Sequence, residues 1–133
     1  MSKSAIYVVN SGAQSVPVDG TIGLGGVVRR FGCAIALSGN SVTIDEAGYY
    51  DINVSITAEP TVAGTITVTL FNNGVAVPGA TASATAAAAG DPVNLSFQSV
   101  LRVFCGANTG SLTLVLTGGA ANITNSAIVV NKI

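Results

Sequence analysis

The side chains that most often perform catalysis or bind metals are scarce in this chain. It contains no histidine, which is the usual general base and the commonest zinc ligand. Asp45 and Glu46 are adjacent, but calcium needs about six to eight oxygen ligands and no regularly spaced acidic loop supplies them. Asp51 and Glu59 could form a carboxylate pair for glycoside hydrolysis, yet Asp51 faces outward on its predicted strand. These carboxylates therefore indicate an acidic turn and a solvated strand face.

The two cysteines and one glycine-rich loop give no candidate catalytic, metal-binding or phosphate-binding site. Cys33 and Cys105 lie far apart and match no metal-binding spacing, so we expect two buried reduced thiols, with a disulfide as the alternative. Neither thiol has a histidine that could activate it. The loop at 23–26 lacks the Lys-Ser/Thr ending of a phosphate cradle. The sequence predicts that the protein is not an enzyme and binds no cofactor or metal.

Basic residues are few, and only Arg29 and Arg30 are adjacent. Five basic and six acidic residues give a net charge of −1, which is too little clustered positive charge for nucleic-acid binding. Arg29 and Arg30 are candidates for contacts with an acidic patch on a protein partner. The alternative is that they are solvated charges on an edge strand that discourage aggregation.

The composition indicates self-association. Only 8% of the 133 residues are charged, against about 25% in an average soluble protein, and the mean hydropathy is +0.63. No apolar run approaches the roughly 18 residues of a membrane span, and the first residues do not resemble a signal peptide. We expect no membrane partner, and an apolar surface that is covered by further copies of the chain.

The pattern around which the chain is organised lies at 48–58. From Tyr50 onward, every second residue is apolar and the residues between are polar, which predicts a half-buried strand. The run 65–71 alternates in the same way, and Asn73-Gly74 after it predicts a hairpin. A strand with one apolar face needs a second layer to cover it.

The remaining segments predict further strands and no helix. We expect a loop with one short edge strand at 10–26, strand or loop at 27–31, and an extended segment at 80–89, where alanine propensity alone would favour a helix. The far half of 93–104 is apolar enough to be covered on both faces, and the last strand, 123–133, is expected in the centre of a sheet. About eight to ten strands predict a single all-β domain over 1–133, an antiparallel sandwich or jelly roll. An immunoglobulin-like sandwich is the rival, weakened by the absence of tryptophan.

Two stretches resemble a known superfamily. Gly48-Tyr49-Tyr50-Asp51-Ile52 resembles a strand start in the jelly rolls of the tumour necrosis factor and complement globular-head superfamily. The run 65–80 is similar to small jelly-roll proteins of bacteriophage structural gene clusters and of bacterial collagen-like filament tips. The resemblance begins near Ile35 and implies a compact homotrimer. It gives these aromatic candidates for the trimer interface: Tyr7, Tyr49, Tyr50, Phe97 and Phe104.

The function implied by this resemblance is structural. The leading hypothesis is a trimeric capsid decoration or head-fibre protein on a bacteriophage virion surface, bound to the major capsid protein or another virion component. Residues 1–31 would be the attachment segment, so deleting 2–15 should abolish capsid binding and leave the trimer folded. One alternative is a receptor- or carbohydrate-binding tip module of a phage tail or baseplate. Another is the tip domain of a spore-surface or collagen-like filament.

Overall fold

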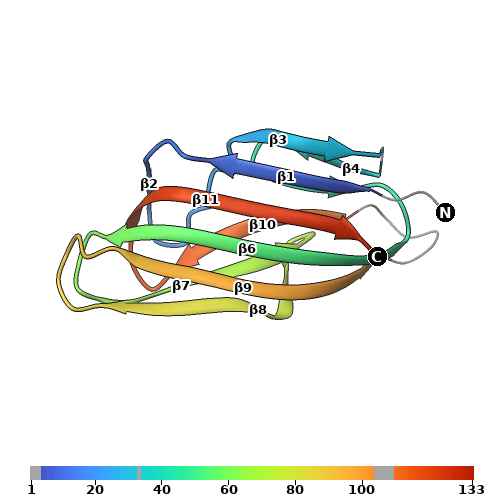
Figure 1. Cartoon of the computed structure of the whole chain (residues 1–133). Coiled ribbons are helices and arrows are strands. Elements are labelled where there is room, and N and C mark those ends of the chain that lie inside the picture. The colour runs from blue at the N-terminus through green and yellow to red at the C-terminus, as the bar shows by residue number, and fades with distance from the viewer. Residues whose placement is uncertain (1–3, 33, 104–109) are drawn as a thin grey trace.

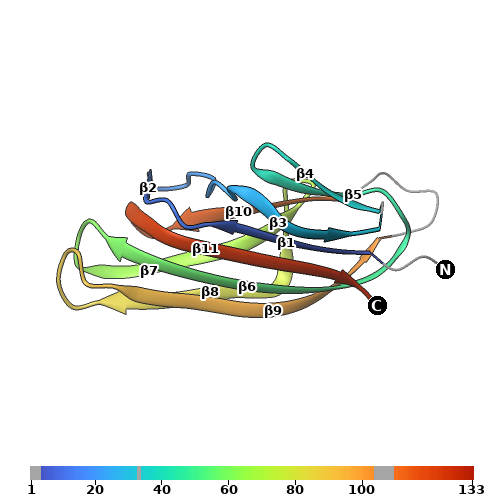
Figure 2. The same cartoon turned by 45° about the horizontal axis from the view of Figure 1, so that its top comes forward.

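The protein folds as two antiparallel sheets packed face to face (Figures 1 and 2). The computed structural model describes residues 4–32, 34–103 and 110–133, and no helix in these ranges could cross a membrane. The eleven strands of the described residues are β1 (Ala5–Asn10), β2 (Gln14–Val16), β3 (Gly26–Phe31), β4 (Ile35–Ser38), β5 (Ser41–Ile44), β6 (Gly48–Pro60), β7 (Gly64–Asn72), β8 (Val75–Ala86), β9 (Val93–Val103), β10 (Gly110–Thr117) and β11 (Ala121–Lys132).

One sheet has the order β3-β1-β11-β6-β9, with β2 paired to the beginning of β11. Figure 1 shows this sheet from its outer side, with β3 at one edge and β9 at the other. The second sheet has the order β4-β5-β10-β7-β8. The all-β jelly-roll prediction is therefore confirmed, with one strand more than the expected eight to ten.

The core lies between the sheets and is filled by aliphatic side chains. In β6 the even-numbered side chains from Tyr50 to Ala58 are all buried, as the alternation predicted. They face buried residues of the second sheet such as Val68 and Leu114. The accessible surface is 6392 Å², close to the roughly 6,400 Å² expected for a compact monomer of this mass.

Three local predictions are confirmed. Asn73 and Gly74 have φ angles of 52° and 82°, and Asn72 pairs with Val75 across them, as in a type I′ hairpin. The alanine-rich segment is extended over 80–86, where it forms the second half of β8, and 87–89 belong to the turn that follows. The last strand, β11, lies between β1 and β6.

The prediction for the far half of residues 93–104 was wrong. Strand β9 is an edge strand whose side chains alternate along its whole length, and Val100 is 59% exposed. A run of apolar residues thus reflects an exposed apolar edge here, not a strand covered on both faces.

The N-terminal residues are part of the fold and not a separate appendage. Strand β1 pairs with both β11 and β3. Ile6, Val8, Val16, Ile22 and Leu24 are all buried in the core. Deleting residues 2–15 would remove β1 and its two core side chains, so we now expect that deletion to unfold the chain. An attachment role for residues 1–31 stays a prediction, and it must use surface that the folded strands expose.

Candidate interaction surface

The outer face of the six-stranded sheet is built from rows of side chains that run across the strands. Antiparallel pairing places directly opposed residues on the same face. One row contains Arg29 of β3, Tyr7 of β1, Val129 of β11, Asn53 of β6 and Gln98 of β9. The next row contains Phe31, Ala5, Asn131, Asp51 and Val100 in the same strand order.

At the β3 edge of the sheet, the large side chains of Phe31 and Tyr7 flank the small side chain of Ala5. Phe31 is 64% exposed and Tyr7 is 38% exposed, while Ala5 lies between them in the rows. These residues, with Arg29 and Val129, line a depression of about 330 Å³. We name Ala5, Tyr7, Arg29 and Phe31 the β3/β1 patch. It joins exposed aromatic rings to one guanidinium group, the residue types that dominate protein interfaces.

A second exposed cluster lies at the opposite edge. Tyr49 is 52% exposed and, two residues on, Asp51 lies beside Val100. The guanidinium of Arg102 lies over the Tyr49 ring, 5.7 Å from its centroid. We name Tyr49, Asp51 and Val100 the β6/β9 patch.

A shallow groove lies across β11, β6 and β9, lined by both apolar and polar side chains. A row of small side chains, Ala127, Ser55 and Ser96, lies beside the larger Asn53 and Gln98. This difference in size produces a groove of about 390 Å³. Its amides and hydroxyls can donate and accept hydrogen bonds.

The outer face of the second sheet is different in kind. Its five strands contain no charged residue. Hydroxyl pairs cross from β7 to β8, with Oγ1–Oγ1 distances of 2.8 Å for Thr65 and Thr85 and 3.2 Å for Thr69 and Thr81. These hydroxyls bond to each other. Among the described strand residues, Val75 is the one large exposed apolar side chain of this sheet, and the other six lie on the first sheet.

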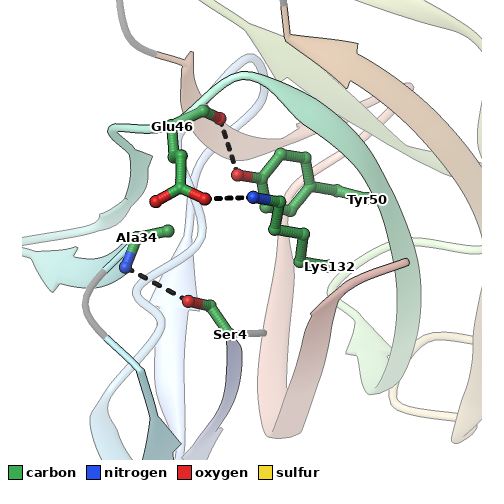
Figure 3. A network of polar contacts seen from close by, with 5 residues as sticks. All are labelled: Ser4, Ala34, Glu46, Tyr50 and Lys132. Carbon is green, nitrogen blue, oxygen red and sulfur yellow. Dashed lines mark hydrogen bonds and ion pairs between the residues drawn. The ribbon is translucent and has the colours of Figure 1, made fainter. Parts of the chain in front are cut away.

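Tyr50 was a candidate for the trimer interface, but it is fully buried within one chain. Its hydroxyl donates a hydrogen bond of 2.6 Å to the backbone oxygen of Glu46 (Figure 3). Tyr50 therefore has no exposed surface that could contact another copy. It is a core residue and not a trimer-interface residue. The alternation that placed Tyr49 outside already placed Tyr50 inside.

A polar network surrounds the Tyr50 hydroxyl. The Lys132 ammonium forms an ion pair with the Glu46 carboxylate, and the backbone N–H of Ala34 donates to Ser4 Oγ at 3.2 Å (Figure 3). Burial, followed by the negative charges of Glu46 and Asp45, raises the pKa of the Tyr50 hydroxyl above its ordinary value. The network joins the ends of β1, β6 and β11 and has a structural role.

The other sequence-predicted residues are distributed as follows. Tyr7 and Tyr49 are exposed on the outer face, on strands β1 and β6, which lie on either side of β11. Phe97 is partly buried and packs against the core. Arg29 and Arg30 are both exposed, but Arg30 Nε donates to the backbone oxygen of Ile35 at 2.9 Å, toward the second sheet. Phe104, Cys33 and Cys105 lie outside the described residues.

Sequence reasoning missed Phe31 and Val100 as surface residues. Phe31 lies in a segment that could be strand or loop, and Val100 lies in an apolar run, so neither pattern showed which face was exposed. Within the described ranges, no group of three or more carboxylate, thiol or imidazole side chains lies close enough to hold a metal ion.

The strand order and the two packed sheets define a jelly roll of the tumour necrosis factor and complement globular-head type. Murine APRIL superposes with a TM-score of 0.75 at 13% identity, over 99% of this chain and 100% of APRIL. The globular domain of zebrafish complement 1qA protein gives 0.72 at 11% identity, over 99% and 97%. The PRD1 vertex protein P5 gives 0.60 at 15% identity, over 98% and 96%. No protein-family model matches the chain, and no curated protein matches its sequence. At these identities the similarity establishes the fold.

Proposed function

We propose that this protein is a non-enzymatic structural component of a bacteriophage virion, a trimeric capsid decoration or head-fibre protein at the particle surface. The observation that supports this most directly is the similarity to PRD1 vertex protein P5, which extends over 98% of this chain. The name of that protein places it at a vertex of PRD1. The shared fold extends over nearly the whole chain.

The surface is consistent with such a role. Exposed aromatic and aliphatic side chains lie at both edges of the six-stranded sheet, where they favour association with protein surfaces. Tyr7 and Tyr49 remain candidates for contacts between copies, and Arg29 and Arg30 for contacts with the major capsid protein or another virion component.

The test is to locate the protein on the particle. Virions produced from the phage genome that carries the gene are purified and labelled with gold-conjugated antibody against this chain, then viewed by electron microscopy. We expect label over the capsid. Purified particles that lack the chain by mass spectrometry would contradict the proposal.

A second candidate function is carbohydrate recognition at the tip of a tail or baseplate. The groove lined by Asn53, Ser55, Ser96 and Gln98 favours it, because amides and hydroxyls recognise sugar hydroxyl groups. A glycan array on the purified protein tests this candidate. Binding that Gln98→Ala abolishes, together with gold label on the tail, would favour it over the capsid role.

A further inference from the structure

Strand β3, at one margin of the first sheet (Figure 1), is exposed along its whole length. All six of its residues are exposed, which is true of no other strand in the described part of the chain. Arg29 lies opposite the exposed Tyr7 on the outer face, while Arg30 lies opposite the buried Ile6 and is still exposed. Both faces of this edge strand are therefore accessible.

The backbone of β3 is paired on one side only. It pairs with β1, and no backbone hydrogen bond joins it to another described segment. Every second residue of an edge strand directs its N–H and C=O groups away from the sheet, where a further strand can pair with them. The bulge at Val28 leaves 29–31 in regular register with β1. The opposite edge strand, β9, packs closely against β8 of the second sheet, whereas β3 has few contacts with β4.

The side chains of β3 combine positive charge with apolar surface. Arg29 and Arg30 point to opposite faces, because they are adjacent in a strand. No carboxylate lies on β1 or β4, the two strands in closest contact with β3, and neither guanidinium forms an ion pair within the described ranges. Large apolar side chains are exposed on either side of the arginines, Val27 and Val28 before them and Phe31 after them.

The β3 strand of a second copy is a poor partner for this edge. Antiparallel pairing of two β3 strands would bring two guanidinium groups from each copy onto one short ribbon. Like charges close together across strands destabilise a sheet, and in the same way edge charges discourage aggregation. The strand that fits has carboxylates where β3 has arginines, and apolar side chains on either side of them.

We infer that β3 accepts an extended acidic segment of another protein as an added strand. Two adjacent carboxylates of this segment pair with Arg29 and Arg30, one on each face, and the flanking apolar side chains pack beside Val28 and Phe31. Main-chain hydrogen bonds give such a contact its affinity, and the side chains give it specificity. The inference rests on the proposed function, because it names the kind of segment that the capsid partner offers.

The test is an NMR titration of the isotope-labelled full chain with the peptide acetyl-Val-Thr-Glu-Glu-Thr-Val-amide. We expect the peptide to shift the amide signals of residues 26–31 and to slow their hydrogen exchange, since free N–H groups become hydrogen-bonded. The counterpart with Lys-Lys in place of Glu-Glu should bind at least about tenfold more weakly. A backbone N-methylated acidic peptide keeps the charges but loses the hydrogen-bond donors, and should not bind.

Charge reversal on β3 should exchange the preference. The chain with both Arg29→Glu and Arg30→Glu should bind the lysine peptide and should bind the acidic peptide at least about tenfold more weakly than wild type. The control Arg102→Glu removes an arginine from β9 and should leave binding of the acidic peptide unchanged. Thermal unfolding confirms that each variant is folded.

Three results with the wild-type chain would overturn the inference: equal binding of the acidic and lysine peptides, equal binding of the N-methylated peptide, or unchanged β3 signals at about 1 mM peptide. Protection of the β3 amides that rises with protein concentration in the absence of peptide would also overturn it, because a second copy would then cover the strand.

The proposed function is tested separately from this contact. Gold label over the capsid together with no peptide binding would contradict the inference alone. Peptide binding at β3 by a chain that is absent from purified virions would contradict the capsid role alone.

Discussion

At the scale of single residues, the Tyr50 hydroxyl is held by a backbone oxygen near the turn before its own strand. The bond to the Glu46 carbonyl is 2.6 Å long, and the ring is fully buried. A buried phenol in this position anchors the beginning of β6 against the acidic turn at Asp45 and Glu46. Burial and the two carboxylates both disfavour the ionised phenolate.

Replacing Tyr50 by phenylalanine tests this description. The free energy of unfolding at pH 7 should fall by about 1 kcal/mol, because one hydrogen bond is lost. The pKa of Tyr50 is raised in the folded protein, so its contribution is present below pH 10, the ordinary value, and is lost as the pH rises above it. Urea unfolding at pH 7 and pH 11 should show a larger loss for wild type than for Tyr50→Phe.

The matched control is Tyr49→Phe, one residue earlier and more than half exposed. It should leave the free energy of unfolding at pH 7 unchanged. An equal effect of both substitutions would mean that the Tyr50 hydrogen bond does not stabilise the fold.

The ion pair between Lys132 and Glu46 gives a second test at this scale. Only 7% of the Lys132 side chain is exposed, against 43% for Glu46. Glu46→Gln leaves a buried ammonium without its carboxylate and should cost about 1–3 kcal/mol. Lys132→Met leaves a carboxylate that water can reach, and should cost less than about 1 kcal/mol. Urea unfolding measures both, and the reverse order would contradict the description.

At the scale of elements, β1 is a structural strand and not an attachment arm. Ile6 is 1% exposed and belongs to the core. Ile6→Ala should lower the free energy of unfolding by about 2–5 kcal/mol, and deleting residues 2–15 should unfold the chain, as measured by circular dichroism. Val28→Ala on the exposed strand β3 is the control and should change stability by less than about 0.5 kcal/mol. A folded deletion variant would contradict this assignment.

Alanine substitutions at two glycines in turns distinguish the cost of backbone strain from the cost of a steric clash. Gly74 and Gly25 both have a φ of 82°. A Cβ at Gly74 would meet nothing within 4 Å, whereas a Cβ at Gly25 would clash with the backbone oxygen of Val9. Gly74→Ala should cost about 1 kcal/mol from the backbone alone. Gly25→Ala should cost clearly more in thermal unfolding, and equal costs would contradict this.

The sequence predicted the elements better than the surface. The alternation in β6 and the Asn73-Gly74 turn are local signals, and both were interpreted correctly. The ion pair of Glu46 with Lys132 joins residues 86 positions apart, so no local pattern could indicate it. The exposure of Val100 depends on β9 being an edge strand, which is a property of the assembled sheet. The candidate patches could therefore be found only after strand order was known.

At the scale of the whole molecule, polar character is divided between the two sheets. The strands of the second sheet have no charged residue and expose hydroxyl groups that pair across β7 and β8. The first sheet has charged side chains and exposes the aromatic rings of Tyr7, Phe31 and Tyr49. The total surface is ordinary for a monomer of this mass, so the reason to expect association is where the apolar groups lie and not how much surface is exposed.

The most direct test of the central claim is the mass of the purified wild-type chain in solution, measured by light scattering and repeated after dilution. A stable mass of three times 13.1 kDa is the expected result. A monomer that stays soluble at every concentration would contradict the trimeric assembly.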